Sequence, residues 1–293
     1  MLPRIYTIMF WVSVSLTVMA VISVAVYGLR LSVDFRGGSV IEVNFLSRPS
    51  PADIQKTLSP ILSDIEISPV ESSGMILRTH ELSEDQHQQI LGALAAAYDG
   101  VQEKQFSSIG PVVGNELKQK SIYGIVTVLL AVIVYIAFVF RKIGRTTSSW
   151  AMGLAAIVAL VHDVAIPFGV FAWLGHYYGV EISSVFVAAA LTILGFSVSD
   201  TVVIFDRVRE NILRKGNQGE FGRIVHQSVL QTLTRSLNTV FTVLLSLFAI
   251  YFFGGESIHY FALALIIGIF LGAYSSIFVA SPLLVWWSRR RPR

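Results

Sequence analysis

Residues 182–205 read ISSVFVAAALTILGFSVSDTVVIF, and Asp200 is the only charged residue in this run. A helix of about 20 apolar residues crosses a hydrocarbon core about 30 Å thick, so the run predicts a membrane-spanning helix. The composition of the whole chain agrees. Of its 293 residues, 14% are charged and 54% are hydrophobic, whereas soluble domains have roughly 25% charged residues. This composition excludes an ordinary water-soluble enzyme.

Five more apolar runs have a similar length, which predicts six membrane-spanning helices in all. They are residues 5–27, 122–140, 150–174, 237–253 and 261–287. The first run could instead be a cleaved signal peptide, but it is longer than the 7 to 15 residues of a signal h-region. A retained anchor is therefore favoured.

The positive charges predict how the chain is oriented in the membrane. Fourteen Lys and Arg residues flank the spans on one side, and the other eight all lie in the long segment 30–120. Cytoplasmic loops carry the excess of Lys and Arg. Both termini are therefore expected in the cytoplasm, and residues 30–120 outside it. The predicted divisions are 1–29 with the first helix, 30–120 as an extracytoplasmic domain, and 121–293 with the other five helices.

The segment 30–120 is long enough to fold as a domain. Alternating apolar residues predict strands at 39–45, 65–70, 75–79 and 101–106. Helical spacing predicts helices over 52–62 and over 83–98, the second with Ser83 as N-cap. The order β-α-β-β-α-β is that of the ferredoxin-like split unit. The fold class is thus a six-helix membrane protein with a small α+β domain inserted between its first two spans.

Several functional classes lack support in the residues. The chain has no cysteine, and HExxH, GxSxG and P-loop patterns are missing, so neither an enzyme nor a metal site is expected. His80 and His87 are interpreted as exposed surface histidines. A formal charge of +3 is too small to indicate a nucleic-acid partner. The basic stretch 206–235 is interpreted as an amphipathic surface helix.

Asp200 is the first candidate functional residue, because an ionised side chain within a span costs at least about 2.5 kcal/mol and is a functional-site hypothesis by default. Ser197 lies three residues earlier on the same helix face and Thr201 is adjacent, so both are expected to support the carboxylate. Arg235 precedes the next span near the same membrane level and is the expected counter-charge. A structural ion pair between the two helices is the alternative.

Asp163 is a second acid inside a predicted span. It lies beside His162, with Pro167 four residues later. The pair could relay protons, or it could fix a helix interface through hydrogen bonds. The residues alone leave the two interpretations even.

The stretch Asp34-Phe35-Arg36-Gly37-Gly38 follows the first span. Two glycines at the mouth of a strand allow a backbone bend, and a plain turn is the simpler interpretation.

Five segments in this order resemble the SecF family of the bacterial Sec protein-export machinery, within the RND transporter superfamily. They are VDFRGG (33–38), GPVVG (110–114), LVHDV (160–164), LGFSVSDTVVIFDR (194–207) and QTLTRSLNT (231–239). Family members usually have Asn where this chain has Ser199, and serine keeps a polar side chain there.

The resemblance implies a role. SecF chains supply half of an RND-type bundle that SecD completes, and the pair uses a proton gradient, or in some members sodium, to promote late translocation through SecYEG after SecA has acted. Asp200 then matches the ion-coupling acid and Arg235 its partner, and Asp34, Phe35, Gly37 and Gly38 form part of a hinge. The outer domain would move with its counterpart on SecD and help to pull or hold the emerging polypeptide. The chain would lie in the bacterial inner membrane, with no cofactor other than the coupling ion.

Two alternatives remain open at this point. The chain could be a self-sufficient RND-type transporter of small molecules or ions that acts as a homodimer. It could also be a structural adaptor that bridges translocon subunits.

Overall fold

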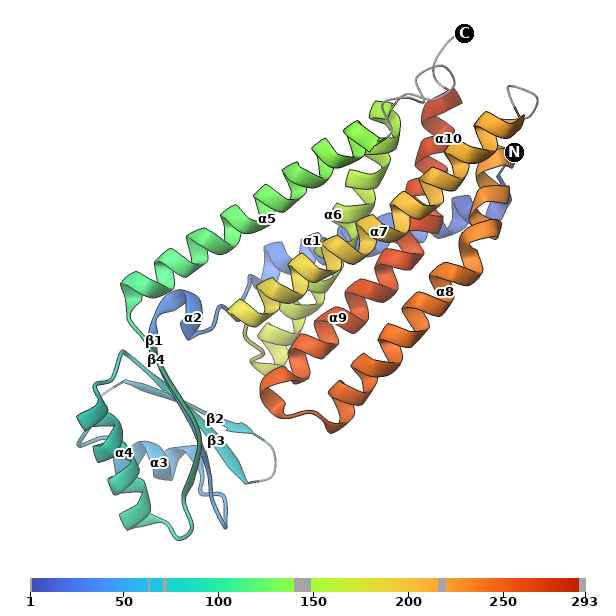
Figure 1. Cartoon of the computed structure of the whole chain (residues 1–293). Coiled ribbons are helices and arrows are strands. Elements are labelled where there is room, and N and C mark those ends of the chain that lie inside the picture. Colours follow the sequence, from blue (N-terminus) through green and yellow to red (C-terminus); the bar gives the residue numbers. More distant parts are fainter. Residues whose placement is uncertain (1, 63, 71–72, 140–148, 216–219, 290–293) are drawn as a thin grey trace. The chain divides into compact units, whose positions relative to one another are not determined.

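The computed structural model describes residues 2–62, 64–70, 73–139, 149–215 and 220–289. It divides the chain into two compact units (Figure 1). The helical unit comprises Met1–Arg30 and Tyr123–Arg293, and the sheet unit is Leu31–Ile122. The insertion after the first span therefore folds around a core of its own.

The described residues of the sheet unit form four strands and three helices, followed by the start of the long helix that leaves the unit. Its elements are α2 (Val33–Arg36), β1 (Gly38–Asn44), α3 (Pro51–Leu58), β2 (Ile65–Val70), β3 (Gly74–Thr79), α4 (Glu84–Ala97) and β4 (Gln102–Ile109). The strand order is β2-β3-β1-β4 and every pair is antiparallel. The predicted split β-α-β-β-α-β unit is confirmed.

The strand register places alternate residues of the sheet against α3 and α4. Ile41 of β1 pairs with Leu77 of β3, and both side chains are buried with Ile54 of α3 and Ile90 of α4. Ser83 caps α4 through the backbone N–H of Gln86, whose side chain bonds back to the Ser83 N–H. This capping box satisfies two donors that a helix start leaves open, and the predicted N-cap role of Ser83 is confirmed.

The helical unit contains the membrane-spanning helices. They are α1 (Arg4–Tyr27), α5 (Pro111–Val139), α6 (Ser149–Tyr178), α7 (Ser184–Lys215), α8 (Phe221–Phe253), α9 (Glu256–Ser275), a π-helix, η2 (Ser276–Ala280), and α10 (Ser281–Arg289). Six helical segments of the described chain are long and apolar enough to cross a membrane, the last running from α9 through α10. The prediction of six spans is confirmed.

The stretch 206–235 differs from its prediction as a separate surface helix. It forms the end of α7 and the beginning of α8, which extend past their apolar runs. Val208, Ile224 and Val225 are buried in the helical core. The Asn211 side chain donates to Ser228 Oγ at 2.8 Å and to Gln231 Oε1 at 2.9 Å. The stretch is amphipathic, as predicted, but the apolar faces of the two helix ends are buried in the core of the helical unit.

Small residues let α7 and α9 approach closely. A Cβ atom on Gly272 would lie 3.2 Å from Ser197 Cβ, and one on Gly268 would overlap the Ile193 side chain. Glycines four residues apart are a known device for close helix packing in membranes. This contact brings the Ser275 and Ser197 side chains to the same place.

Candidate ion-coupling site

The two intramembrane acids come from neighbouring helices. Asp163 belongs to α6 and Asp200 to α7, and α9 packs against both of these helices. Asp163 is fully buried, while Asp200 is half-buried. The region therefore contains two carboxylates in different surroundings.

Asp163 accepts hydrogen bonds from two other helices. Its Oδ2 atom accepts from Ser197 Oγ at 2.5 Å and from Ser275 Oγ at 2.7 Å. Ser197 was expected to support Asp200, one turn along its own helix, but its hydroxyl binds Asp163. Ser197 lies where α7 meets both neighbouring helices, because its Cβ atom lies against Gly272 of α9 while its hydroxyl reaches Asp163 of α6.

His162 lies against Asp163, as expected from their adjacency. The His162 Nδ1 and Asp163 Oδ1 atoms are 2.8 Å apart, and the ring is almost completely buried. The other ring nitrogen, Nε2, is enclosed and has no hydrogen-bond partner among the described residues. The Tyr274 ring of α9 stacks on the His162 ring, with the two ring centroids 6.3 Å apart.

Asp200 receives a hydrogen bond from α8. Ser236 Oγ donates to Asp200 Oδ1. The other oxygen, Oδ2, is enclosed without a hydrogen-bond partner in the described part of the chain. Thr201, the second expected supporter, bonds Ser276 Oγ at 2.8 Å instead. A buried carboxylate oxygen without a donor is costly.

Arg235 lies on α8 immediately before Ser236, and its side chain is exposed. No ion pair joins it to Asp200 among the described residues, although its charge acts on Asp200 over a longer distance. Successive helix residues point about 100° apart. When Ser236 faces α7, Arg235 therefore points away, and the predicted direct pairing is absent from this arrangement.

Sequence reasoning missed the hydroxyls that α8 and α9 contribute. Ser236 stands inside the segment that contains Arg235, and Ser275 and Ser276 form a polar pair within an apolar run. Ser276 also begins the π-helix, and such bulges occur frequently at functional sites. The pair of serines after Gly272 was the available signal.

The Gly37–Gly38 motif forms a tight corner inside the sheet unit. Gly37 has φ 77° and Gly38 has φ 118°, in the region that side chains disfavour. A Cβ atom on Gly37 would lie 2.6 Å from the Cα atom of Pro111, and one on Gly38 would lie 2.6 Å from the Thr79 carbonyl oxygen. Phe35 is buried, and the Asp34 N–H donates to Ser32 Oγ at 3.3 Å. The chain's entry into the sheet unit is thus packed on the start of α5, its exit.

The two histidines of the sheet unit have different environments. His80 is exposed, as predicted. His87 is buried, so its prediction as a surface residue was wrong. It stacks on Phe106 with ring centroids 3.8 Å apart, and its Nε2 atom lies 3.1 Å from Glu103 Oε1. No group of three or more His, Cys, Asp or Glu residues in the described chain could hold a metal ion.

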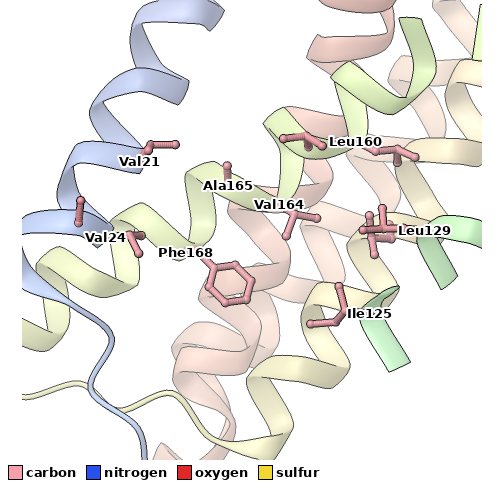
Figure 2. A pocket seen from close by; sticks show the side chains of 11 residues that line it. Val21, Val24, Ile125, Leu129, Leu160, Val164, Ala165 and Phe168 are labelled. Carbon is pink, nitrogen blue, oxygen red and sulfur yellow. The ribbon is translucent and has the colours of Figure 1, made fainter. Parts of the chain in front are cut away.

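An apolar cavity of about 470 Å³ lies elsewhere in the helical unit. Figure 2 shows side chains of α1, α5 and α6 gathered around it. Its lining is Val21, Val24, Ala25, Ile125, Leu129, Leu160, Val161, Val164, Ala165, Phe168 and Leu194. None of these side chains can bind an ion or a proton, so the cavity does not extend the polar site.

The amino-acid sequence of the chain is similar to those of known proteins. Residues 90–290 match the family described as protein export membrane protein SecD/SecF, C-terminal, and residues 22–45 match the SecD/SecF GG motif. The chain is 39% identical to protein translocase subunit SecF of Thermobaculum terrenum, over 96% of this chain and 92% of that protein. It is 35% identical to the subunit of the same name from Anaerolinea thermophila, over 95% and 91%.

A solved structure is also similar. The crystal structure of SecDF, a translocon-associated membrane protein from Thermus thermophilus, matches with a TM-score of 0.84 at 30% identity. The match covers 97% of this chain and 38% of that chain. A second structure, SecDF in a super-membrane-facing form, matches with a TM-score of 0.67. This chain therefore corresponds to a little over a third of the SecDF polypeptide.

Proposed function

Because the chain belongs to the SecF family of protein translocase subunits, we propose that it pairs with a SecD-type chain and couples a proton gradient to late steps of protein export. It is a multi-pass membrane protein with six apolar helices. The match to 38% of a SecDF chain supports a partner that supplies the remaining part. With this partner, the six helices complete a twelve-helix RND-type body.

The proposed orientation follows from the positive charges. Both termini and the end of α7 face the cytoplasm, and the sheet unit lies outside. Protons then run inward, from the sheet-unit side of the spans towards the basic rim. In this orientation Asp200 is six residues, or about 9 Å along α7, before Asp206 at the cytoplasmic edge.

One observation carries the proposal. Asp200 has one oxygen hydrogen-bonded to Ser236 and the other enclosed without a donor in the described part, while the cation Arg235 stands exposed on the adjoining helix. Protonation removes the cost of the unpaired charge, and ionisation favours an approach of Arg235. The carboxylate thus has two states that favour two positions of α8 relative to α7.

The energy of one proton is small in comparison with unfolding a substrate. One charge crossing about 100 mV supplies about 2.3 kcal/mol, which is enough to bias a two-state element. Many cycles are needed for each exported protein. The role is therefore repeated capture and release of a polypeptide by the sheet unit, after the SecA ATPase has inserted it into SecYEG.

Export from membrane vesicles tests the proposal. Translocation is started with SecA and ATP and completed under an imposed proton gradient, with and without this chain. We expect the gradient to speed completion only when the chain is present, and a protonophore to remove the gain. Equal completion without the chain would overturn the proposal, and a gain from a sodium gradient alone would reassign the ion.

The two alternatives give different results. A homodimeric transporter would move a dye into liposomes as purified chain alone, and affinity purification from membranes would recover no SecD-type protein. A structural adaptor would recover translocon subunits, yet its export would not respond to the gradient.

A further inference from the structure

Asp163 lies at a defined level of the membrane span. Its Oδ2 atom accepts from Ser197, which lies three residues before Asp200 on α7. Three helical residues rise about 4.5 Å. In the proposed orientation α7 runs from the outside to the cytoplasm, so Asp163 lies about one turn nearer the outside than Asp200. An inward proton reaches it first.

Hydroxyl groups connect the surroundings of the two acids. Ser275, the last residue of α9, donates to Asp163 Oδ2, and Ser276, the first residue of η2, bonds Thr201 and lies beside the Asp200 carboxylate. A hydroxyl both donates and accepts hydrogen bonds, so it can take a proton on one side and release one on the other.

The groups that face Asp163 are few and can be named for each helix. His162 is on its own helix, Ser197 is on α7 one turn before Asp200, and Ser275 is on α9, where the Tyr274 ring stacks on His162. On α8, Arg235 is exposed. The cation nearest to Asp163 in the described chain is His162, which is charged only when protonated. A permanent structural ion pair is therefore not what holds this acid.

We propose that Asp163 is a second proton-binding carboxylate in series with Asp200, and this inference rests on the proposed coupling function. The step transfers one proton from the carboxyl group of Asp163 to the carboxylate of Asp200, leaves Asp163 ionised and needs no other reactant. Ionised Asp163 accepts the Ser197 and Ser275 hydrogen bonds, which join α6 to α7 and α9. Protonated Asp163 weakens these bonds, so each proton also loosens the three-helix contact.

Infrared difference spectroscopy of sided proteoliposomes tests the order of the two acids. The protein is purified with its associated subunits, and the pH is lowered on one face at a time while the protonated-carboxyl band is recorded. We expect Asp163→Asn to remove part of the band. We also expect the Asp200 band of this variant to respond only to acid on the cytoplasmic face. A spectrum identical to wild type, or an Asp200 band that still responds from both faces, would overturn the proposal.

A second variant protects the test if Asp163→Asn fails to fold. Ser275→Ala removes one donor to the ionised carboxylate. We expect half-protonation of Asp163 to move to higher pH by about one to two units, the effect of one hydrogen bond to a charged group. The control is Ser246→Ala, whose exposed hydroxyl bonds only its own helix at the Thr242 carbonyl, and it should cause no shift. An unshifted Ser275→Ala spectrum would contradict the assignment.

The outcomes separate this inference from the proposed function. If export ignores the gradient but Asp163 titrates before Asp200, the coupling proposal fails and the proton pathway stands. If export needs the gradient and Asp163→Asn exports normally, the serial pathway fails and the coupling role of Asp200 stands.

Discussion

Ser197 donates its hydroxyl hydrogen to Asp163 on α6, although it lies one turn from Asp200 on its own helix. Helix α7 therefore carries Asp200 and also carries Ser197, which is a hydrogen-bond donor to Asp163. A shift of α7 therefore changes the surroundings of both carboxylates together.

Substitutions of Arg235 distinguish a role of this residue in coupling from a role in folding. Its side chain is exposed and forms no ion pair with Asp200 in the described part of the chain, so Arg235→Ala should change the free energy of unfolding by less than about 0.5 kcal/mol. Gradient-driven export should nevertheless be lost. Arg235→Lys keeps the charge without the planar fork and should retain part of it. A large fall in the thermal unfolding temperature in detergent would instead indicate a structural ion pair.

Ser236 is expected to contribute to stability and export through its hydrogen bond to Asp200. Ser236→Ala removes that donor, and an ionised carboxylate with one donor fewer should cost about 1–3 kcal/mol. Thermal unfolding in detergent measures the loss, and vesicle export should slow at the same time. Ser246→Ala, on the exposed face of the same helix, is the matched control. Equal behaviour of the two variants would exclude a role for Ser236 at the site.

Gly272 tests the close contact between α7 and α9. An added methyl group would press on the Cβ and Cα atoms of Ser197 at 3.2 and 3.3 Å, so Gly272→Ala should destabilise the chain by about 1–3 kcal/mol through overpacking. Gly124→Ala is the control, because a Cβ there meets nothing within 4 Å. Unfolding midpoints of both variants give the comparison. An unchanged unfolding midpoint in Gly272→Ala would show that α7 and α9 do not approach this closely.

Gly37 tests the corner between the entry and exit of the sheet unit. Its positive φ and the 2.6 Å approach to Pro111 Cα leave no room for a side chain, and Gly37→Ala should destabilise the unit by at least about 1 kcal/mol. Gly92→Ala in α4 meets nothing within 4 Å and should be neutral or slightly stabilising. Limited proteolysis of whole chains compares the two. Matching digestion rates would contradict the packing argument.

The features that depend on local sequence pattern, the membrane spans and the acids within them, could be predicted from the sequence. Apolar length located six spans, and the scarcity of charge made Asp200 and Asp163 stand out. The hydroxyl partners depend on which helix faces which, and tertiary contacts such as that of Gly272 on α9 with Ser197 on α7 are not visible in the apolar pattern. Residue spacing within α7 could therefore only assign Ser197 to the wrong acid. His87 was misplaced for a similar reason, since its burial depends on stacking against Phe106 of the following strand, β4, which the pattern within α4 does not show.

In the proposed function, the Asp200 carboxylate carries the coupling proton. Asp200→Asn keeps the size of the side chain and removes the titration, and it is compared with wild type for export from vesicles under a proton gradient. We predict that the variant assembles with its SecD-type partner at wild-type levels and exports no faster with the gradient than without it. Wild-type stimulation by the gradient in Asp200→Asn would contradict the account.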